Sequence, residues 1–400
     1  MAAGIYIHIP FCVQKCLYCD FVSGCGTGDE MKGYQKALLN EIESTVIKDT
    51  VDSVFFGGGT PSVYPVEYIG EILELLKQMG VLHVFSSESV HNVSVSDTAC
   101  NKKKTDVEIT MEVNPGTVNR DKLSYLKEIG INRLSIGLQS ANDEELKILG
   151  RIHDYEQFLE SYQNARESGF TNINVDLMAA IPKQTISSYK DTLLKVMALN
   201  PEHISAYSLI VEEKTPFYEQ YREGGSKECD LPDEDSERKM YYLTKRELEQ
   251  NGYYRYEISN YAKAGYECKH NIKYWSRDNY YGFGAAASSL VDNIRYTNVR
   301  DRNEYRKANG DISIICEEIS ELSRNEQMEE FMFLGLRKSK GVSMTEFKKN
   351  FNRQMECVYG GKIEKLKKNG LLKQEGNRLF LTDHGIDISN MVLAEFLISE

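Results

Sequence analysis

The stretch that decides the fold is IYIHIPFCVQKCLYCDF, which runs from Ile5 to Phe21. Its first part alternates β-branched residues with other residues and stops at Pro10, a pattern typical of a strand that ends at a proline. Three cysteines in a C-x3-C-x2-C spacing follow at once: Cys12, Cys16 and Cys19. This order predicts three thiolates on one loop at the end of a strand.

Three soft thiolate ligands on a short loop favour an iron–sulfur cluster. Such a cluster normally has four protein ligands, so three cysteines would leave one iron of a [4Fe–4S] cube open to an exogenous ligand. The alternatives are a zinc site and three buried structural cysteines, although zinc usually takes four ligands and commonly uses C-x2-C pairs. The open iron is the most informative prediction that the sequence supports.

Length and composition exclude several classes of protein. The 400 residues exceed one ordinary core and predict two domains, or one barrel with an appended module. A net charge of −12 argues against a nucleic-acid partner. The nine cysteines show no paired disulfide spacing. With no secretory leader and no run of about 18 apolar residues, we expect a cytoplasmic protein without a membrane span, while peripheral membrane contact stays open.

Six predicted strands alternate with amphipathic helices through the first half of the chain. The strands are expected at residues 5–9, 51–56, 107–113, 132–140, 170–182 and 203–209. This α/β pattern predicts a parallel sheet of the TIM-like (β/α)6 type, a partial, closed or nearly closed barrel. Residues 81–106 interrupt the alternation with a polar segment that contains a lysine triplet, and they predict a surface insertion in which Cys100 is incidental.

Glycines or polar residues mark the carboxyl ends of the predicted strands. A Gly57–Thr60 loop follows the second strand, and Glu112, Gln139 and Asp176 end the next three. Each of these residues alone is more often a satisfied structural group. Ligand-binding groups of parallel barrels lie at the carboxyl ends of the strands, so together with the cysteine loop they predict one shared pocket.

The cysteine spacing and the segment Gly58-Gly59-Thr60-Pro61 resemble the radical S-adenosylmethionine (SAM) superfamily, and the resemblance runs through most of the chain. It implies that amino and carboxylate groups of SAM chelate the open iron of a [4Fe–4S] cluster. It implies the metal ligands Cys12, Cys16 and Cys19. It also implies that SAM contacts Tyr6, Tyr18, Gly58, Gly59, Thr60, Glu112, Gln139, Arg151 and Asp176.

An aromatic region follows the predicted barrel. Eight of the 25 tyrosines and the single tryptophan lie between Tyr253 and Tyr281, and most of them are expected to pack on the barrel. The segment His270-Asn271-x-x-Tyr274-Trp275 resembles the H-N-x-x-Y-W signature of the HemW branch, the heme chaperones. The resemblance implies heme contacts at His270, Tyr274 and Trp275, because histidine and tyrosine are both axial ligands of heme iron. A purely structural histidine stays the alternative.

The last part of the chain predicts a small module. Amphipathic helices from about residue 325, a short β pair that includes residues 378–382, and a last helix over residues 383–397 resemble a winged helix. We therefore predict three parts. They are a radical SAM barrel at 1–215, a linker with the aromatic region at 216–320, and a C-terminal winged-helix-like domain at 321–400.

Phe21 separates two branches of the family. The oxygen-independent coproporphyrinogen III dehydrogenases carry a fourth cysteine at this position, whereas the HemW branch has phenylalanine. The resemblance thus implies a heme chaperone that receives electrons from a donor and transfers heme to haem-dependent respiratory apoproteins. A coproporphyrinogen III dehydrogenase, a related radical enzyme of tetrapyrrole metabolism, or a protein that uses the cluster only to fold stay as alternatives. Whether SAM is turned over, and so whether the protein is an enzyme, stays open.

Two further segments depart from the family pattern. Residues 284–289, Gly-Ala-Ala-Ala-Ser-Ser, lack a histidine that relatives often have. Residues 179–183, Ala-Ala-Ile-Pro-Lys, stand where relatives commonly have Gly-Leu-Pro-Gly, which predicts a less close approach of that backbone to SAM.

Overall fold

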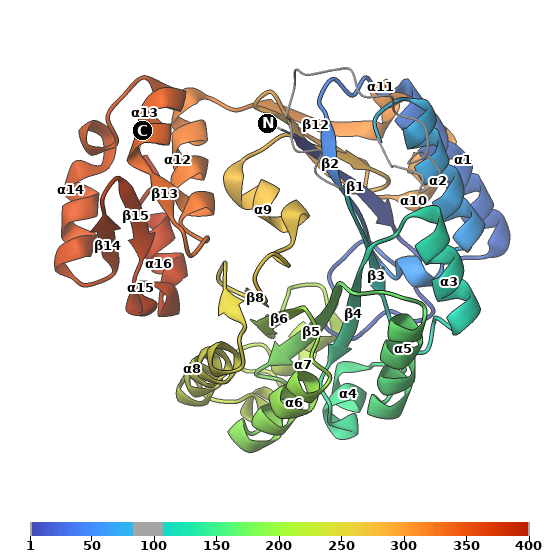
Figure 1. Cartoon of the computed structure of the whole chain (residues 1–400), viewed down its shortest axis with the longest axis horizontal. Coiled ribbons are helices and arrows are strands. Elements are labelled where there is room, and N and C mark those ends of the chain that lie inside the picture. The colour runs from blue at the N-terminus through green and yellow to red at the C-terminus, as the bar shows by residue number, and fades with distance from the viewer. Residues whose placement is uncertain (1, 83–106, 399–400) are drawn as a thin grey trace, which may run out of the picture.

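The computed structural model describes residues 2–82 and 107–398. The predicted insertion with Cys100 lies outside the described residues, apart from residues 81 and 82. The described chain forms one large curved sheet with helices around its outside and a separate C-terminal module beside it (Figure 1). None of the helices in this part of the chain is long and apolar enough to cross a bilayer.

All six predicted strands are present. They are β1 (Ala3–Ile9), β2 (Val51–Gly58), β3 (Glu108–Val113), β4 (Arg133–Gln139), β5 (Ile173–Ala179) and β6 (His203–Ser208). They pair in chain order and every pair is parallel. The helices between them are α1 (Gly28–Ser44), α2 (Val66–Gln78), α3 (Arg120–Ile129), α4 (Asp143–Leu149), α5 (Tyr155–Glu167) and α6 (Ile186–Ala198). Local sequence sets their ends: α1 begins at a capping box in which Thr27 and Glu30 bond each other's backbone.

The sheet does not close into a barrel. On one side, β1 pairs with β9 (Tyr280–Phe283), and beyond it lie β10 (Ser288–Val291), β11 (Ile294–Asn298) and β12 (Cys316–Glu321). On the other side, β6 pairs with β8 (Asn260–Ala262), which pairs with β7 (Tyr254–Arg255). The prediction of a partial barrel is therefore confirmed, and the alternative of a closed barrel is wrong. The sequence did not predict the six later strands that extend this same sheet at both edges.

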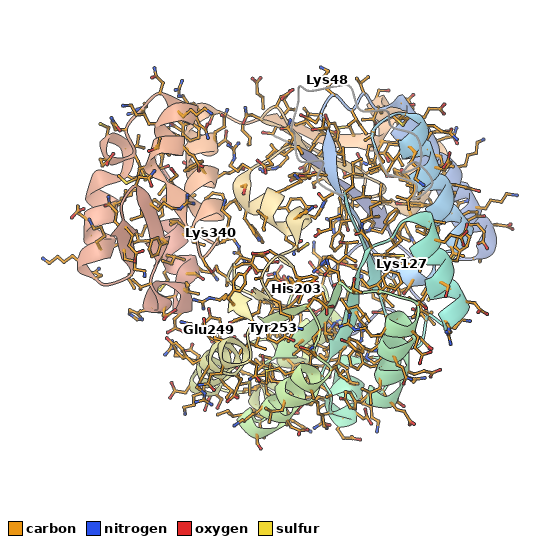
Figure 2. The ribbon with its side chains drawn as sticks, in the orientation of Figure 1. Lys48, Lys127, His203, Glu249, Tyr253 and Lys340 are labelled. Atoms are coloured by element: carbon orange, nitrogen blue, oxygen red, sulfur yellow. The ribbon has the colours of Figure 1, made fainter. Side chains whose placement is uncertain are left out.

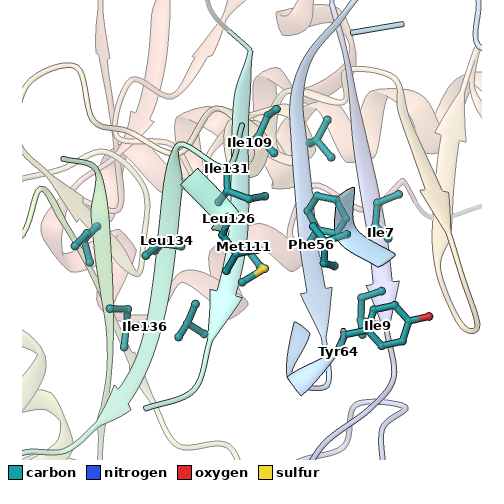
Figure 3. Packing of buried hydrophobic residues seen from close by; sticks show 14 of the residues in the cluster. Ile7, Ile9, Phe56, Tyr64, Ile109, Met111, Leu126, Ile131, Leu134 and Ile136 are labelled. Atoms are coloured by element: carbon teal, nitrogen blue, oxygen red, sulfur yellow. The ribbon is translucent and has the colours of Figure 1, made fainter. Parts of the chain in front are cut away.

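The two faces of the parallel strands differ in polarity. Residues such as Ile7, Phe56, Met111, Leu134 and Ile136 belong to one buried apolar core with the surrounding helices (Figure 3). Burial of each such side chain contributes about 1.5–3 kcal/mol. The intervening residues face the inside of the curved sheet, which we call the lumen, and most of them are polar. Because the apolar face is used for helix packing, the lumen is left free to hold a polar ligand.

One short helix, α9 (Lys269–Ser276), enters the lumen from the amino ends of the strands. Its first backbone N–H groups, those of Lys269 and His270, donate to the carboxylate of Glu108 at the start of β3, at 3.2 and 3.3 Å. The helix lies tightly against β1, because a Cβ on Gly4 would stand 3.1 Å from Nδ1 of His270 and from Cδ of Lys273. The H-N-x-x-Y-W segment is therefore the floor of the lumen.

The C-terminal module has the predicted winged-helix order and its own apolar core. Its elements are α12 (Arg324–Gly335), β13 (Val342–Ser343), α13 (Met344–Phe351), α14 (Met355–Lys368), β14 (Leu372–Glu375) and β15 (Arg378–Leu381). The single last helix predicted over 383–397 is wrong. Two helices stand there, α15 (Asp383–Asp387) and α16 (Ser389–Ala394), and the break at Ile388 allows Val392 and Phe396 to enter the module's core.

The module attaches to the barrel at α9. The buried carboxylate of Glu330 on α12 forms ion pairs with Arg277, which ends α9, at 2.8 Å and with Arg295 on β11 at 2.7 Å. Lys340, in the loop after α12, lies on the side of the module that faces the barrel (Figure 2). In the same loop, Ser339 N donates to Tyr256 O at 2.9 Å.

The other helical segments are η1 (Pro61–Val63), α7 (Pro216–Tyr221), η3 (Glu228–Asp230), α8 (Glu234–Gln250), α10 (Arg302–Ala308) and α11 (Ile312–Ile315).

Candidate functional site

A cavity of about 680 Å³ opens at the carboxyl ends of the parallel strands and extends down the lumen to α9. Every residue predicted for the site except Trp275 lines this cavity. The lining residues among them are Tyr6, Cys12, Cys16, Tyr18, Cys19, Gly58, Gly59, Thr60, Glu112, Gln139, Arg151, Asp176, His270 and Tyr274. Their individual roles stay predictions, but the single pocket predicted from the strand ends is present.

Backbone contacts hold the cysteine loop. Cys12 N donates to Gly24 O at 3.0 Å, and Gly24 N donates to Pro10 O at 3.1 Å. Arg302, at the start of α10, donates to the carbonyl oxygens of Pro10, Gly24 and Cys25, each at 3.2 Å. The loop is thus fixed from outside the cavity, and its thiols do not have to hold it in place.

The three thiols fit a cluster better than a single ion. Within residues 2–82 and 107–398, no three His, Cys, Asp or Glu side chains converge on one metal ion. A [4Fe–4S] cluster does not require such convergence, because each thiolate binds a different iron. Thr60 Oγ1 donates to Cys12 Sγ at 3.3 Å, and Arg151 Nη1 lies 3.5 Å from Cys16 Sγ. Both sulfur atoms thus accept contacts from protein donors and all three thiols line the cavity, so the residues present fit three-cysteine ligation.

The loop after β2 lies directly beneath the cysteine loop. Gly59 N donates to Ile9 O at 2.9 Å, and Thr60 N donates to Phe11 O at 2.8 Å. A Cβ on Gly59 would stand 2.8 Å from Phe11 O and 3.0 Å from Cys12 Sγ. Gly58 has a φ of +111°, in the region that favours glycine. These positions require glycine because the two loops approach so closely.

Two buried carboxyl groups face the middle of the cavity. Burial raises the pKa of Glu112 to about 8, with a smaller contribution from the nearby Asp176. Burial also raises the pKa of Asp176, although hydrogen bonds from Asn174 Nδ2 at 2.7 Å and Ser135 Oγ at 3.1 Å oppose that shift. This pair can retain a proton near neutral pH, and it can accept hydrogen bonds from hydroxyl or ammonium groups.

Arg151 belongs to a network that the sequence revealed only in part. Its Nη2 donates to Asn114 Oδ1 at 2.9 Å and to Gly137 O at 2.6 Å. Asn114 Nδ2 in turn donates to Thr60 Oγ1 at 2.9 Å. Asn114 is therefore a site residue that we did not predict, although its place directly after a strand was a usable signal.

A second residue missed from the sequence is Tyr207. Its hydroxyl donates to Gln139 Oε1 at 2.9 Å, and Gln139 itself has a φ of 72° at the end of β4. Tyr207 lies on β6 in the same alternation phase as Ser205, which also lines the cavity. The strand-end rule could therefore have found it.

His270 occupies the floor of the cavity and is only 1% exposed. Its Nδ1 is 3.1 Å from Ser53 Oγ and its Nε2 is 2.8 Å from the hydroxyl of Tyr274. Burial lowers the pKa of His270 to about 3, with smaller contributions from the charges of Lys273 and Arg133. The ring is therefore neutral, and both nitrogens are hydrogen bonded.

Trp275 lies away from the cavity. The guanidinium of Arg337, from the segment after α12, stands 4.4 Å from the centroid of its ring. This residue thus belongs to the contact between α9 and the C-terminal module. Its predicted heme contact would need a ligand that reaches beyond the lumen.

The two segments that depart from the family pattern lie outside the cavity lining. In residues 284–289, Gly284 N donates to Glu41 Oε2 and Ala285 N to the hydroxyl of Tyr34, both at 2.9 Å, so this segment packs behind β1. Ala180 and Lys183 have φ values of 60° and 64°. They adopt the left-handed conformation that glycine adopts without strain, at the positions where the family pattern has glycine.

Comparisons with known proteins agree with this geometry. The sequence profile of the Radical SAM superfamily matches residues 6–196, and that of the HemN C-terminal domain matches residues 322–388. The heme chaperone HemW of Lactococcus lactis is 36% identical over 99% of this chain and 97% of its own length. HemW of Bacillus subtilis is 35% identical over 98% of both chains. The coproporphyrinogen III oxidase HemN of Escherichia coli, a radical SAM enzyme, shares the fold, with a TM-score of 0.80 at 22% identity over 99% of this chain and 90% of its own.

Proposed function

The chain belongs to the HemW heme chaperone family within the radical SAM superfamily, and from this premise we propose that it binds heme and transfers it to haem-dependent apoproteins. The observation that carries the proposal is the similarity to curated heme chaperones over almost the whole chain. A cytoplasmic location, respiratory apoproteins as recipients and an external electron donor belong to the same proposal.

Membership of the superfamily implies a [4Fe–4S] cluster and SAM. We propose that Cys12, Cys16 and Cys19 hold the cluster. When bound, the cluster supplies single-electron chemistry to SAM. What the chain itself contributes is a loop fixed by Arg302 and two donors, Thr60 and Arg151, that lie against the sulfur atoms of Cys12 and Cys16.

SAM is proposed to occupy the strand-end part of the cavity. The guanidinium of Arg151 suits the SAM carboxylate, since a planar fork pairs with a carboxylate through two bonds. Glu112 and Asp176 suit the ammonium group and the ribose hydroxyls. The remaining proposed contacts are Tyr6, Tyr18, Gly58, Gly59, Thr60 and Gln139. Their common position around one cavity supports this assignment.

Heme is proposed to contact His270 and Tyr274, both of which line the cavity. Trp275 is proposed to act indirectly, because it lies on the same helix, α9, and helps to hold that helix in position. Neutral histidine is the form that ligates iron. Iron at Nε2 has to replace the 2.8 Å hydrogen bond to Tyr274. Heme binding is therefore expected to move the Tyr274 side chain.

A titration of the reconstituted protein tests the chaperone proposal. Under anaerobic conditions, heme added to the cluster-loaded protein should give a shifted Soret band that saturates, and the bound heme should pass to an apo-cytochrome. A protein that binds no heme would overturn the proposal.

The dehydrogenase alternative has its own assay. Phe21, 62% exposed at the cavity mouth, stands where that enzyme has a cysteine. Incubation with a reductant, SAM and coproporphyrinogen III should give no decarboxylated product. Product formation would show that the protein is an enzyme.

A further inference from the structure

The deepest part of the cavity lies below the strand ends. We call it the lower chamber and define it by its lining residues Tyr6, Phe55, Arg133, Asn174, His270 and Tyr274. One wall is aromatic: the rings of Phe55 and His270 stack at 5.3 Å, and those of Tyr6 and Phe55 at 6.3 Å. The opposite wall, from β4 and β5, carries Arg133 and Asn174. The lower chamber thus has a flat apolar surface on one side and the cationic side chain of Arg133 on the other.

Arg133 is a buried charge without a direct partner. It is 1% exposed, and its Nε is enclosed with no hydrogen-bond partner. No residue of the described chain forms a hydrogen bond or an ion pair with its guanidinium. Thr110, its register partner on β3, also has an enclosed hydroxyl without a partner. Buried polar groups are normally paired, so a buried guanidinium that lines the cavity without a partner indicates a missing acceptor.

The nearest carboxylates do not supply that acceptor. Glu108 and Asp176 attract Arg133 electrostatically, but neither forms an ion pair with it. Glu108 is occupied by the backbone N–H groups that start α9, and Asp176 accepts from Asn174 and Ser135. The other groups close to Arg133 are the thiol of Cys268, the hydroxyl of Tyr256 and the neutral rings of His203 and His270.

We propose that the lower chamber is a second ligand subsite, separate from the SAM part of the cavity, that binds a carboxylate carried on a flat apolar group. A guanidinium binds a carboxylate through two parallel bonds, and the aromatic wall packs against the apolar body. The carboxylate comes either from a propionate side chain of heme or from a free aromatic acid. The heme source rests on the proposed function, whereas the subsite itself does not.

A heavy-atom probe tests the subsite directly. Crystals of the full-length protein soaked in 4-bromobenzoate should show an anomalous bromine peak in the lower chamber, with the carboxylate at Arg133. The same soak of Arg133→Met crystals should show no peak. A wild-type chamber without bromine, or a peak that persists in Arg133→Met, would overturn the proposal.

Heme and heme dimethyl ester distinguish the two sources. If heme supplies the carboxylate, wild-type protein should bind heme about 10- to 100-fold more tightly than the ester, as expected for a charge-assisted hydrogen bond. Arg133→Met should lose this preference and Arg133→Lys should regain part of it. The control is Arg120→Met, which removes an exposed arginine that pairs with Glu167 at 3.3 Å on the surface. Equal binding of heme and ester in all variants, together with a bromine peak, would assign the subsite to a free acid.

The subsite proposal can be judged even if the chaperone proposal fails or the Arg133→Met variant does not fold. If neither form of heme binds, the chaperone proposal fails, and the bromobenzoate experiment still decides the subsite. Because Arg133 is unpaired, its replacement by methionine should leave the melting temperature of the ligand-free protein unchanged or higher. If that variant does not fold, Arg133→Lys keeps the charge but loses the planar fork, and its bromine peak should be weaker than that of wild type.

Discussion

The cysteine loop and α9 both carry side chains of the kind that bind iron, yet their surroundings differ. Cys16 and Cys19 are half-buried at the mouth of the cavity, and backbone bonds and Arg302 hold the loop. His270 is buried at the floor, and both of its ring nitrogens are hydrogen bonded within the protein. The cysteine thiols do not hold their loop in place, so they are free to bind iron. His270 has to break one of its two hydrogen bonds before it can bind iron.

Removal of one thiol should have the largest effect. Cys12→Ala should lose the cluster completely, because two cysteines cannot hold a cube that already lacks a fourth protein ligand. Iron and sulfide content and the brown absorption band measure the loss. Cys25→Ala is the matched control, since Cys25 is exposed and only donates to Val13 O at 3.0 Å. A Cys12→Ala protein with its full iron content would refute the assignment of the loop.

Replacement of His270 tests the other side of the comparison. His270→Ala should lower the free energy of unfolding by about 2–4 kcal/mol, because it leaves a cavity and unpaired groups on Ser53 and Tyr274. It should also abolish heme binding if the histidine ligates iron. Tyr274→Phe keeps the ring and frees Nε2, so it should bind heme at least as tightly as wild type. Loss of heme in Tyr274→Phe would instead make the tyrosine the ligand.

Two glycines give a matched pair, one for each region. An alanine at Gly59 would meet the backbone oxygen of Phe11 at 2.8 Å, whereas one at Gly4 would meet only side chains of α9 at 3.1 Å. Overpacking costs typically about 1–3 kcal/mol, more where backbone has to shift. Gly59→Ala should therefore reduce cluster retention, and Gly4→Ala should reduce only the melting temperature. Equal iron content in the two variants would show that Gly59 is no more important for cluster retention than Gly4.

Glu112 lies between the two regions and gives a pH dependence. Its usual pKa of 4.5 is raised to about 8 in the folded protein by burial. Between these values the unfolded chain has released a proton that the folded protein keeps, so stability falls as pH rises through this window. Glu112→Gln does not titrate, so its melting temperature should decline less between pH 5 and 8 than that of wild type. Parallel declines would show that another group is responsible.

The sequence was sufficient to predict the parallel strands and the site residues at their ends, because both depend on short spacings along the chain. Period-two alternation and short apolar runs located all six parallel strands, and the rule that strand ends carry ligand groups gathered Glu112, Gln139 and Asp176 into one cavity. The opening of the sheet depends instead on the pairing of β1 with residues 280–283, a contact that no local pattern reveals.

Other features depend on the same long-range packing. Whether His270 was free or satisfied depends on Ser53, which is distant in sequence. The positive φ of Ala180 was invisible for a related reason, since nothing in alanine signals a conformation that its surroundings impose. Arg133 was overlooked because a charge at the start of a strand usually faces solvent, and only the closed environment of the lumen makes it unusual.

The position of β1 in the middle of the sheet also has a consequence for biosynthesis. The strand that leads into the cysteine loop is made first, but one of its neighbours, β9, and the clamp Arg302 are made only in the last third of the chain. At a synthesis rate of roughly 5–20 residues per second, the clamp emerges about fifteen seconds to a minute after the cysteines. We expect stable cluster insertion only after the clamp residue has left the ribosome. Iron found on stalled nascent chains shorter than residue 280 would contradict this order of maturation.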